Sequence, residues 1–265
     1  ISQWLSFFLL VFVFSVYVIA SVGFFVGLSV SVAILPLACL LSLSLTLFFA
    51  RKEKIKSPQL LILLAFALLF ICPLISDLFY DVTFDGQAYH QSAVIRMSQG
   101  WNPFHEKLLA QGSNSIWNNH YPKFAEVFEA CVYKLTRRIE MAKCLNIFLI
   151  VASFLMGLGV LLRKESLSLQ RSVLYSFLLA ANPVSVYQSL SFYVDGILAS
   201  LLLILLWAVL LFIKGEEKIY SYFVFFAAIC FLINVKFTGL VFVLPVILGS
   251  LLLLLLQRKT QDLFK

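Results

Sequence analysis

Long apolar runs separated by short polar segments dominate the chain. The hydrocarbon core of a membrane is about 30 Å thick, so roughly 20 apolar residues of helix are needed to cross it. Such runs lie near residues 4–21, 28–50, 59–75, 142–162, 173–190, 194–213, 220–233 and 238–256. They lack the alternation of barrel strands, and helices satisfy their own backbone in lipid. The pattern predicts an all-α polytopic transmembrane bundle of about eight spans.

Composition agrees with this pattern. The chain of 265 residues is 62% hydrophobic and 12% charged, whereas soluble domains carry about 25% charged residues. A cytosolic globular enzyme, a disordered tail, a collagen and a disulfide scaffold are therefore excluded. The five cysteines have no metal-ligand or redox spacing, and we interpret them as small core residues.

Basic residues indicate the orientation. Twelve of the twenty lie in four segments, at 51–56, 163–171, 214–218 and 258–265, which fall on one side if eight spans are counted. The positive-inside rule makes that side cytoplasmic. The net charge of +7 is thus a topology signal, and we expect no nucleic-acid partner. Segments 76–141, 182–195 and 234–239 would lie outside.

Three parts follow along the chain. Residues 1–58 would form two transmembrane helices and a basic cytoplasmic loop, residues 59–256 a transmembrane core, and residues 257–265 a cytoplasmic end. The chain begins at Ile1 without an initiator Met and has no basic residue before its first apolar run. A signal peptide is therefore not expected. We expect instead that the chain is a fragment of a longer protein.

The external segment 76–141 differs from the rest of the chain. It holds seven acidic and six basic residues, all three histidines and two of the four tryptophans. Because unstructured loops of this length are uncommon, we expect short helices along the membrane surface, over 86–99, 103–110 and 122–138. The third would carry Pro122 in its first turn, with Glu126 and Glu129 pointing away from its apolar stripe.

Two carboxylates and an imidazole follow the third span, at Asp81, Asp85 and His90. A carboxylate that cations or hydrogen bonds keep ionised can serve as a base, and a helix beginning near Asp85 would align Tyr89 and Arg96 with it. Asp85 capping that helix, with Asp81 solvated, is the alternative. The same three groups are the candidate ligands for a divalent cation, although their spacing requires no metal and no other cofactor is indicated.

Aromatic, amide and imidazole side chains in the loop are suited to sugars. Rings can stack on a pyranose while polar groups bond its hydroxyls. The candidate sugar or acceptor ligands are Tyr89, His90, Trp117, Asn119, His120 and Tyr121. Interfacial anchoring is the alternative for the Trp and Tyr residues. Lys123 is a candidate phosphate partner at a helix start, with a snorkelling cation as the alternative.

Two further polar residues interrupt apolar runs on the same side. Asp195 lies at the outer end of the sixth span and Lys236 at the turn between the last two. Charge at the membrane usually faces a cavity, a partner or the interface. One external site would explain both positions, and Asp195 joins the candidate sugar or acceptor ligands.

Five short motifs, in order, resemble the GT-C superfamily of polytopic membrane glycosyltransferases. The pattern is similar to protein O-mannosyltransferases and aminoarabinose transferases, and extends over roughly 59–256. The motifs are FDGQAYH at 84–90, GWNP at 100–103, YPK at 121–123, YVDG at 193–196 and VKFTG at 235–239. Unlike many relatives, the chain has Asp85-Gly86 in place of paired acids and lacks a full Lys-Pro-Pro segment.

The resemblance implies a plasma (inner) membrane enzyme of envelope glycoconjugate biosynthesis. Its donor would be a polyprenyl-phosphate sugar, and its acceptor a glycan, lipid or protein outside the cytoplasm. Asp85 would be the general base of an inverting transfer, with Lys123, Arg96 or Lys236 stabilising the leaving phosphate. A transporter or flippase for lipid-linked or polar substrates and a non-catalytic subunit of an envelope-assembly complex are the alternatives.

Overall fold

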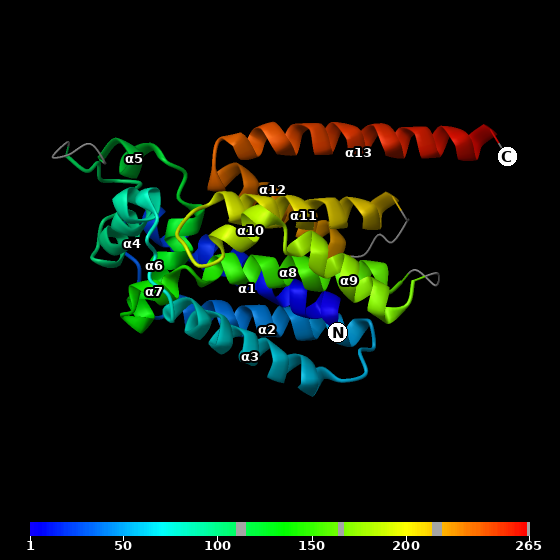
Figure 1. Ribbon diagram of the computed structural model, residues 1–265, viewed down its shortest axis with the longest axis horizontal. Helices are drawn as coiled ribbons and strands as arrows, with labels where there is room; N and C mark the ends of the chain where they lie inside the picture. The colour runs from blue at the N-terminus through cyan, green and yellow to red at the C-terminus, as the bar shows by residue number, and fades with distance from the viewer. Residues whose placement is uncertain (110–114, 164–166, 214–218, 264–265) are drawn as a thin grey trace.

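The structure is a computed structural model that describes residues 1–109, 115–163, 167–213 and 219–263. All its regular elements within these ranges are helices (Figure 1). The prediction of an all-α bundle is therefore confirmed. The long axes of most helices run side by side, and the smaller helices gather at one end of the bundle.

Within the described residues, nine helices form the body of the bundle. They are α1 (Ser2–Phe25), α2 (Ile34–Lys52), α3 (Pro58–Asp77), α8 (Cys144–Leu161), α9 (Leu169–Ala180), α10 (Pro183–Gln188), α11 (Asp195–Ile213), α12 (Ile219–Val235) and α13 (Thr238–Leu263). Five short elements form the end: η1 (Gly86–His90, a π-helical turn), α4 (Gln91–Ser98), α5 (Ser115–His120), α6 (Phe124–Thr136) and α7 (Ile139–Ala142).

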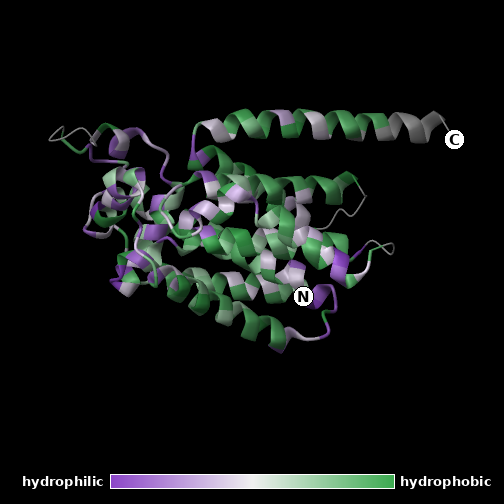
Figure 2. Cartoon of the chain, viewed as in Figure 1, coloured by the Kyte–Doolittle hydropathy of each residue, from purple (hydrophilic) through white to green (hydrophobic). Residues whose placement is uncertain are grey.

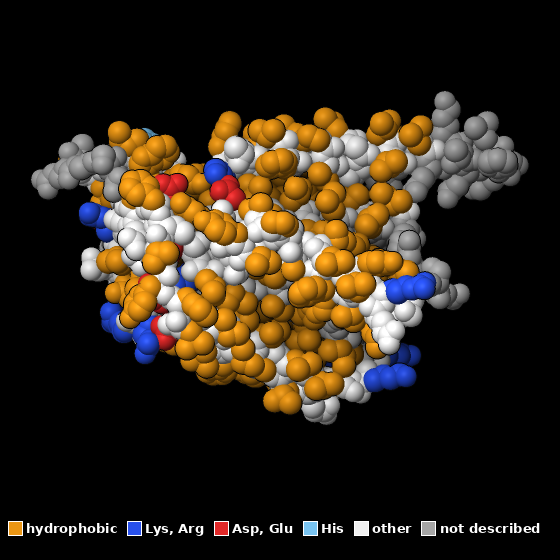
Figure 3. Space-filling model, viewed as in Figure 1, with side chains coloured by type: hydrophobic (Ala, Val, Ile, Leu, Met, Phe, Trp, Pro, Cys, Tyr) orange, Lys and Arg blue, Asp and Glu red, His pale blue; other side chains and the backbone are white. Residues whose placement is uncertain are grey.

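In the part of the chain that the structure describes, five helical segments are long and apolar enough to cross a membrane. They are α1, α2, α3, the segment Ile139–Leu161 and α11. Two shorter apolar helices, Ile219–Val235 and Thr238–Leu253, correspond to the last two predicted spans. Hydrophobic side chains cover most of the visible surface between the two ends (Figure 3), as expected where lipid replaces water. The chain is therefore a membrane protein.

Helix α1 lies at the centre of the bundle. It packs against α2, α3, α6, α8 and α12, and the Phe8 side chain is fully buried. The Ser6 hydroxyl donates to the Ala152 carbonyl on α8 at 2.8 Å. Further along α8, Gly157 leaves room for the Trp207 indole of α11, which an added Cβ would meet at 2.8 Å. Small residues thus let these helices approach closely.

The fifth predicted span, 173–190, is wrong as a single helix. The structure divides it into α9 and α10, with Ala181 and Asn182 between them. Pro183 has no N–H to continue the helix, and the Asn182 side chain caps α10 by accepting from the Ser185 N–H at 3.0 Å.

The predicted loop helices are partly correct. Elements η1 and α4 match 86–99, and α6 matches most of 122–138, but Pro122 precedes α6 and is not in its first turn. No helix forms over the described part of 103–110, and position 110 lies outside the described residues. There the Asn102 side chain accepts from the Phe104 N–H at 3.0 Å, a turn that competes with helix.

The three connections predicted to lie outside meet at one end of the bundle. The Asp81 carboxylate accepts from the Phe192 N–H at 2.8 Å, and Lys236 pairs with Asp195 at 2.7 Å. Hydrophilic side chains are concentrated at this end, around α4 to α7 (Figure 2). The contacts agree with the predicted arrangement of these segments, while the side of the membrane on which they lie stays a prediction.

Candidate functional site

Asp81 fixes the loop in which Asp85 lies. Its Oδ1 accepts from the Thr83 N–H at 2.8 Å and the Thr83 hydroxyl at 2.7 Å, and its Oδ2 accepts from Phe192. Gly86 packs directly on this carboxylate, since a Cβ there would lie 2.2 Å from Asp81 Oδ2. Asp81 is 3% exposed, so it is a structural residue and the alternative in which it is solvated is wrong.

Asp85 lies just before η1 and is half-buried. Its carboxylate lies one helical turn before the Tyr89 phenol. Burial, followed by the charge of Asp85, raises the pKa of Tyr89 well above its usual range. Tyr89 is therefore a neutral phenol close to the Asp85 carboxylate.

Tyr121 connects the loop to the rest of the site. Burial raises its pKa, and the negative charges of Glu126, Asp195 and Asp85 act in the same direction. The two acids Asp85 and Asp195 come from segments more than a hundred residues apart, yet both lie close enough to Tyr121 to influence it. The structure thus brings the two predicted acids to one place.

Asp195 has a cationic partner. The Lys236 ammonium, from the turn between α12 and α13, donates to Asp195 Oδ1 at 2.7 Å. The Lys236 side chain is 33% exposed and that of Asp195 is 47% exposed, so both remain open to a ligand. Asp195 also lies in the first turn of α11, where the helix dipole favours a negative charge.

Aromatic rings line one side of this region. Tyr89 stacks on Trp117 with ring centroids 5.7 Å apart and lies 5.7 Å from Tyr121. Trp117 is 52% exposed. The Lys123 ammonium donates to the Tyr121 carbonyl at 2.5 Å and lies 5.9 Å from the Tyr121 ring. The predicted aromatic cluster therefore forms, and Trp117 presents an open face.

His90 is buried beneath these rings and bonded to an acid. Its Nδ1 lies 2.7 Å from Glu126 Oε1, and the two side chains are 2% and 1% exposed. Although burial alone would raise the pKa of Glu126, the hydrogen bond and charge of His90, with Lys123 nearby, lower it. Burial lowers the pKa of Lys123. These contacts favour a positioning role for His90 over the predicted sugar contact.

The remaining predicted ligands form no hydrogen bond or ion pair with Asp85 or Asp195 in the described parts of the chain. Asn119 exchanges two hydrogen bonds with the Leu108 backbone, each 2.9 Å, and so holds the loop. His120 is exposed. The Arg96 Nε donates to Ser92 on α4 at 3.4 Å, and among the described residues no ion pair joins Arg96 to an acid.

The candidate metal ligands do not converge. Asp81 bonds backbone and hydroxyl donors, and His90 bonds Glu126. Over the described ranges, no group of three or more His, Cys, Asp or Glu side chains is arranged to hold a metal ion. Of the three candidate ligands, Asp85 therefore remains a candidate general base beside the Tyr89 phenol.

Sequence reasoning missed the buried acids of α6. Glu126 and Glu129 were expected to point away from the apolar stripe of this helix, and no burial was predicted for them, yet they are 1% and 0% exposed. Helix α6 contacts α1 and α7 as well as α4, so more than its apolar stripe is covered. The sequence signal that could have indicated their burial is the presence of two acids three residues apart in a loop that also contains His90 and Lys123.

The chain matches no protein-family model, no curated protein and no solved structure. The resemblance to GT-C glycosyltransferases therefore rests on the short motifs alone, and the function is inferred from the side chains described above.

Proposed function

We propose that the chain is a membrane glycosyltransferase that moves a sugar from a polyprenyl-phosphate donor to an acceptor outside the cytoplasm. One observation carries the proposal: the loop of Asp85 and the segment before α11 meet, where Asp81 accepts from the Phe192 N–H at 2.8 Å, and Asp195 is bonded to Lys236. An acid, a cation and open aromatic rings at one end of a membrane bundle are the groups that transfer from a lipid-linked sugar requires.

The donor's two parts match two features of this end. A polyprenyl chain would remain in the bilayer beside the apolar helices, so its phosphate would lie at the membrane surface. Lys236, at 33% exposure, and Lys123 are the cations available near the acids. The exposed face of Trp117, beside Tyr89, offers a surface on which a pyranose ring can stack.

The proposed reaction is a single displacement. Asp85 accepts the proton of an acceptor hydroxyl, whose oxygen forms a bond to the anomeric carbon as the bond from that carbon to the phosphate oxygen breaks. Polyprenyl phosphate leaves with the electron pair, and the anomeric configuration inverts. The neutral Tyr89 phenol, close to Asp85, can orient its carboxylate, and Lys236 or Lys123 stabilises the charge that develops on the leaving phosphate.

Asp85→Asn tests the assignment of the base. Membranes that contain the variant are given a radiolabelled polyprenyl-phosphate sugar, and the label transferred to acceptor is counted. Loss of a general base lowers such rates by about 10²–10⁴-fold, whereas Asp85→Glu should retain part of the activity. Glu106→Gln, which removes an exposed acid of the same loop, is the matched control. Full transfer by Asp85→Asn would eliminate Asp85 as the base.

A transporter is the second candidate, and the break between α9 and α10 favours it. Discontinuous helices commonly form substrate sites in secondary transporters. Here, however, the acids and cations gather at the end of the bundle, at Asp85, Asp195 and Lys236. The enzyme is therefore the proposal that explains more of the polar residues.

A further inference from the structure

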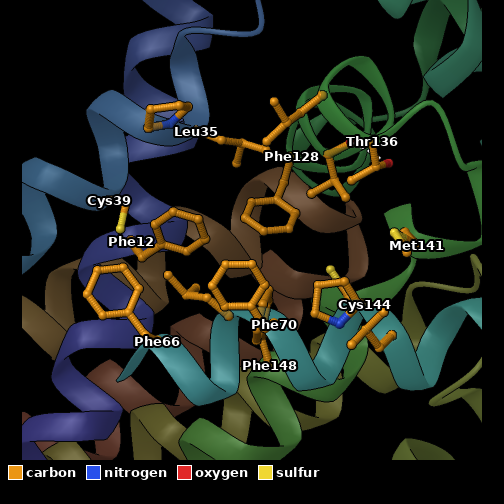
Figure 4. A pocket seen from close by; sticks show the side chains of 16 residues that line it. Phe12, Leu35, Cys39, Phe66, Phe70, Phe128, Thr136, Met141, Cys144 and Phe148 are labelled. Atoms are coloured by element: carbon orange, nitrogen blue, oxygen red, sulfur yellow. Dashed lines mark hydrogen bonds between the residues drawn. The ribbon is translucent and has the colours of Figure 1, made fainter. Parts of the chain in front are cut away.

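An apolar cavity of about 440 Å³ lies beside the bundle, on α2, α3, α6 and α8. Figure 4 shows the rings of Phe12, Phe66, Phe70, Phe128 and Phe148 around it. Thr136 is a hydroxyl-bearing residue at one edge, and the remaining lining is formed by carbon-rich or sulfur-containing side chains. Its volume is within the range of small-molecule pockets.

The cavity has the depth and the opening of a site for a lipid chain. Its α3 wall runs from Phe66 to Leu74, which is about 12 Å along a helix at 1.5 Å per residue. One leaflet of the hydrocarbon core is about 15 Å thick. Phe70 and Leu74 are 68% and 55% exposed, so the cavity opens sideways, where acyl chains of the bilayer lie.

A cation directly follows the last residue that α6 contributes to the cavity lining. Arg137 follows the lining residue Thr136, is exposed, and has a left-handed backbone with φ of 59°. No acid of the described ranges pairs with it. The next residue, Arg138, is held by Asp77 of α3 at 2.6 Å, which joins this end of α6 to the α3 wall. Arg137 therefore remains available for an anion, and guanidinium groups bind phosphate well.

We propose that this cavity binds one acyl chain of an anionic phospholipid whose phosphate lies against Arg137. The charge of Arg137 selects an anionic headgroup, and basic residues beside apolar clefts between membrane helices are typical of such sites. The bound lipid would cover the exposed apolar face of α3, with Phe70 and Leu74, and the exposed Leu135 of α6.

The position on α6 distinguishes this lipid from the proposed donor. Phe128 faces the cavity, whereas Glu126, which bonds His90 beneath Tyr121, lies two residues earlier. Two residues are about 200° around a helix, so the cavity and the carboxylate site are on opposite faces of α6. A donor seated here would hold its phosphate away from Asp85 and Lys236. The inference does not depend on the proposed function.

Native mass spectrometry of the full chain, purified from bilayers that contain equal phosphatidylglycerol and phosphatidylcholine, tests the proposal. The wild type should retain phosphatidylglycerol preferentially. Arg137→Asn removes the charge and keeps a residue that tolerates the left-handed conformation; retention should fall about tenfold, the size of one charge-assisted hydrogen bond. Cys39→Trp, which fills the cavity from α2, should lower it similarly.

Arg171→Gln is the matched control, because it removes an exposed arginine at the start of α9; it should retain the lipid as the wild type does. A thermal unfolding curve of each variant confirms that it is folded. Equal retention of the two phospholipids, or wild-type retention by both Arg137→Asn and Cys39→Trp, would overturn the proposal. Displacement of phosphatidylglycerol by equimolar polyprenyl phosphate would overturn it too, by identifying the occupant as a prenyl lipid.

Discussion

Glu129 is an acidic residue that is buried in the protein interior. Its carboxyl group is fully buried, and neither oxygen has a hydrogen-bond partner within the described residues. Burial, followed by the charges of Glu126 and Asp81, raises the pKa of Glu129 well above its ordinary value. An ionised carboxylate without partners in this position is costly, so the folded protein keeps Glu129 protonated.

Glu129 should make stability depend on pH. Between the ordinary glutamate pKa and the raised pKa, the folded protein binds more protons here than the unfolded chain. The contribution of Glu129 to the free energy of unfolding is therefore fully present below the ordinary pKa and declines as pH rises toward the raised one. Glu129→Gln, which cannot ionise, should lose less stability than the wild type when the pH is raised from about 5 to about 8.

Thermal unfolding in detergent across this pH interval measures the effect. Glu106→Gln changes an exposed acid of the same loop and should follow the wild-type curve. If the curves of Glu129→Gln and the wild type run parallel, Glu129 ionises in the fold without penalty.

At the scale of residues, sequence reasoning found the groups that interrupt apolar runs. Asp85, Asp195 and Lys236 stand out because a charge in or beside a membrane span needs a reason. The partners of His90 and Asp81 could not be predicted, since Glu126 and Phe192 are brought to them by tertiary packing. Asn119 was predicted to be a ligand only because it is an amide residue, but its hydrogen bonds with the Leu108 backbone stabilise the loop.

At the scale of elements, the Lys236–Asp195 pair joins the turn between α12 and α13 to the start of α11. Because both side chains are partly exposed, the pair should contribute only about 0–1 kcal/mol to stability. Its proposed role is in binding, where Lys236 meets the donor phosphate.

Lys236→Gln should therefore reduce sugar transfer much more than it reduces stability. We expect a loss of transfer of about tenfold or more, with a melting temperature near that of the wild type. Lys236→Arg, which keeps the charge, should recover part of the activity. Unchanged donor KM and kcat in Lys236→Gln would show that the pair is only a surface salt bridge.

Long apolar runs predicted most of the helices, because a span is specified by its own sequence. The helix break at Asn182 was also encoded locally, by Pro183 and the Asn182 cap, but the uniform hydropathy of 173–190 concealed it. The absent helix over the described part of 103–110 depends on longer-range contacts. Asn102 bonds the Phe24 carbonyl at the end of α1 at 2.8 Å, and no local pattern reports that contact.

At the scale of the whole molecule, the orientation in the membrane can be measured directly. The positive-inside rule places α5 outside and the connection between α2 and α3 in the cytoplasm. Ile116→Cys, on exposed α5, should react with a membrane-impermeant maleimide in intact cells, whereas the exposed position in Lys56→Cys should react only after permeabilisation. The wild type, whose cysteines are buried or partly buried, is the blank. The reverse labelling pattern would place the acids in the cytoplasm.

The central claim is that the polar end of the bundle breaks a bond to a lipid-linked sugar. Proteoliposomes that contain the purified chain, a polyprenyl-phosphate donor with a labelled sugar, and membrane-derived acceptors separate transfer from transport. Labelled acceptor and free polyprenyl phosphate should form in equal amounts, with both products greatly reduced in Asp85→Asn. Movement of intact donor between leaflets without release of polyprenyl phosphate, at the same rate in the wild type and Asp85→Asn, would contradict the claim.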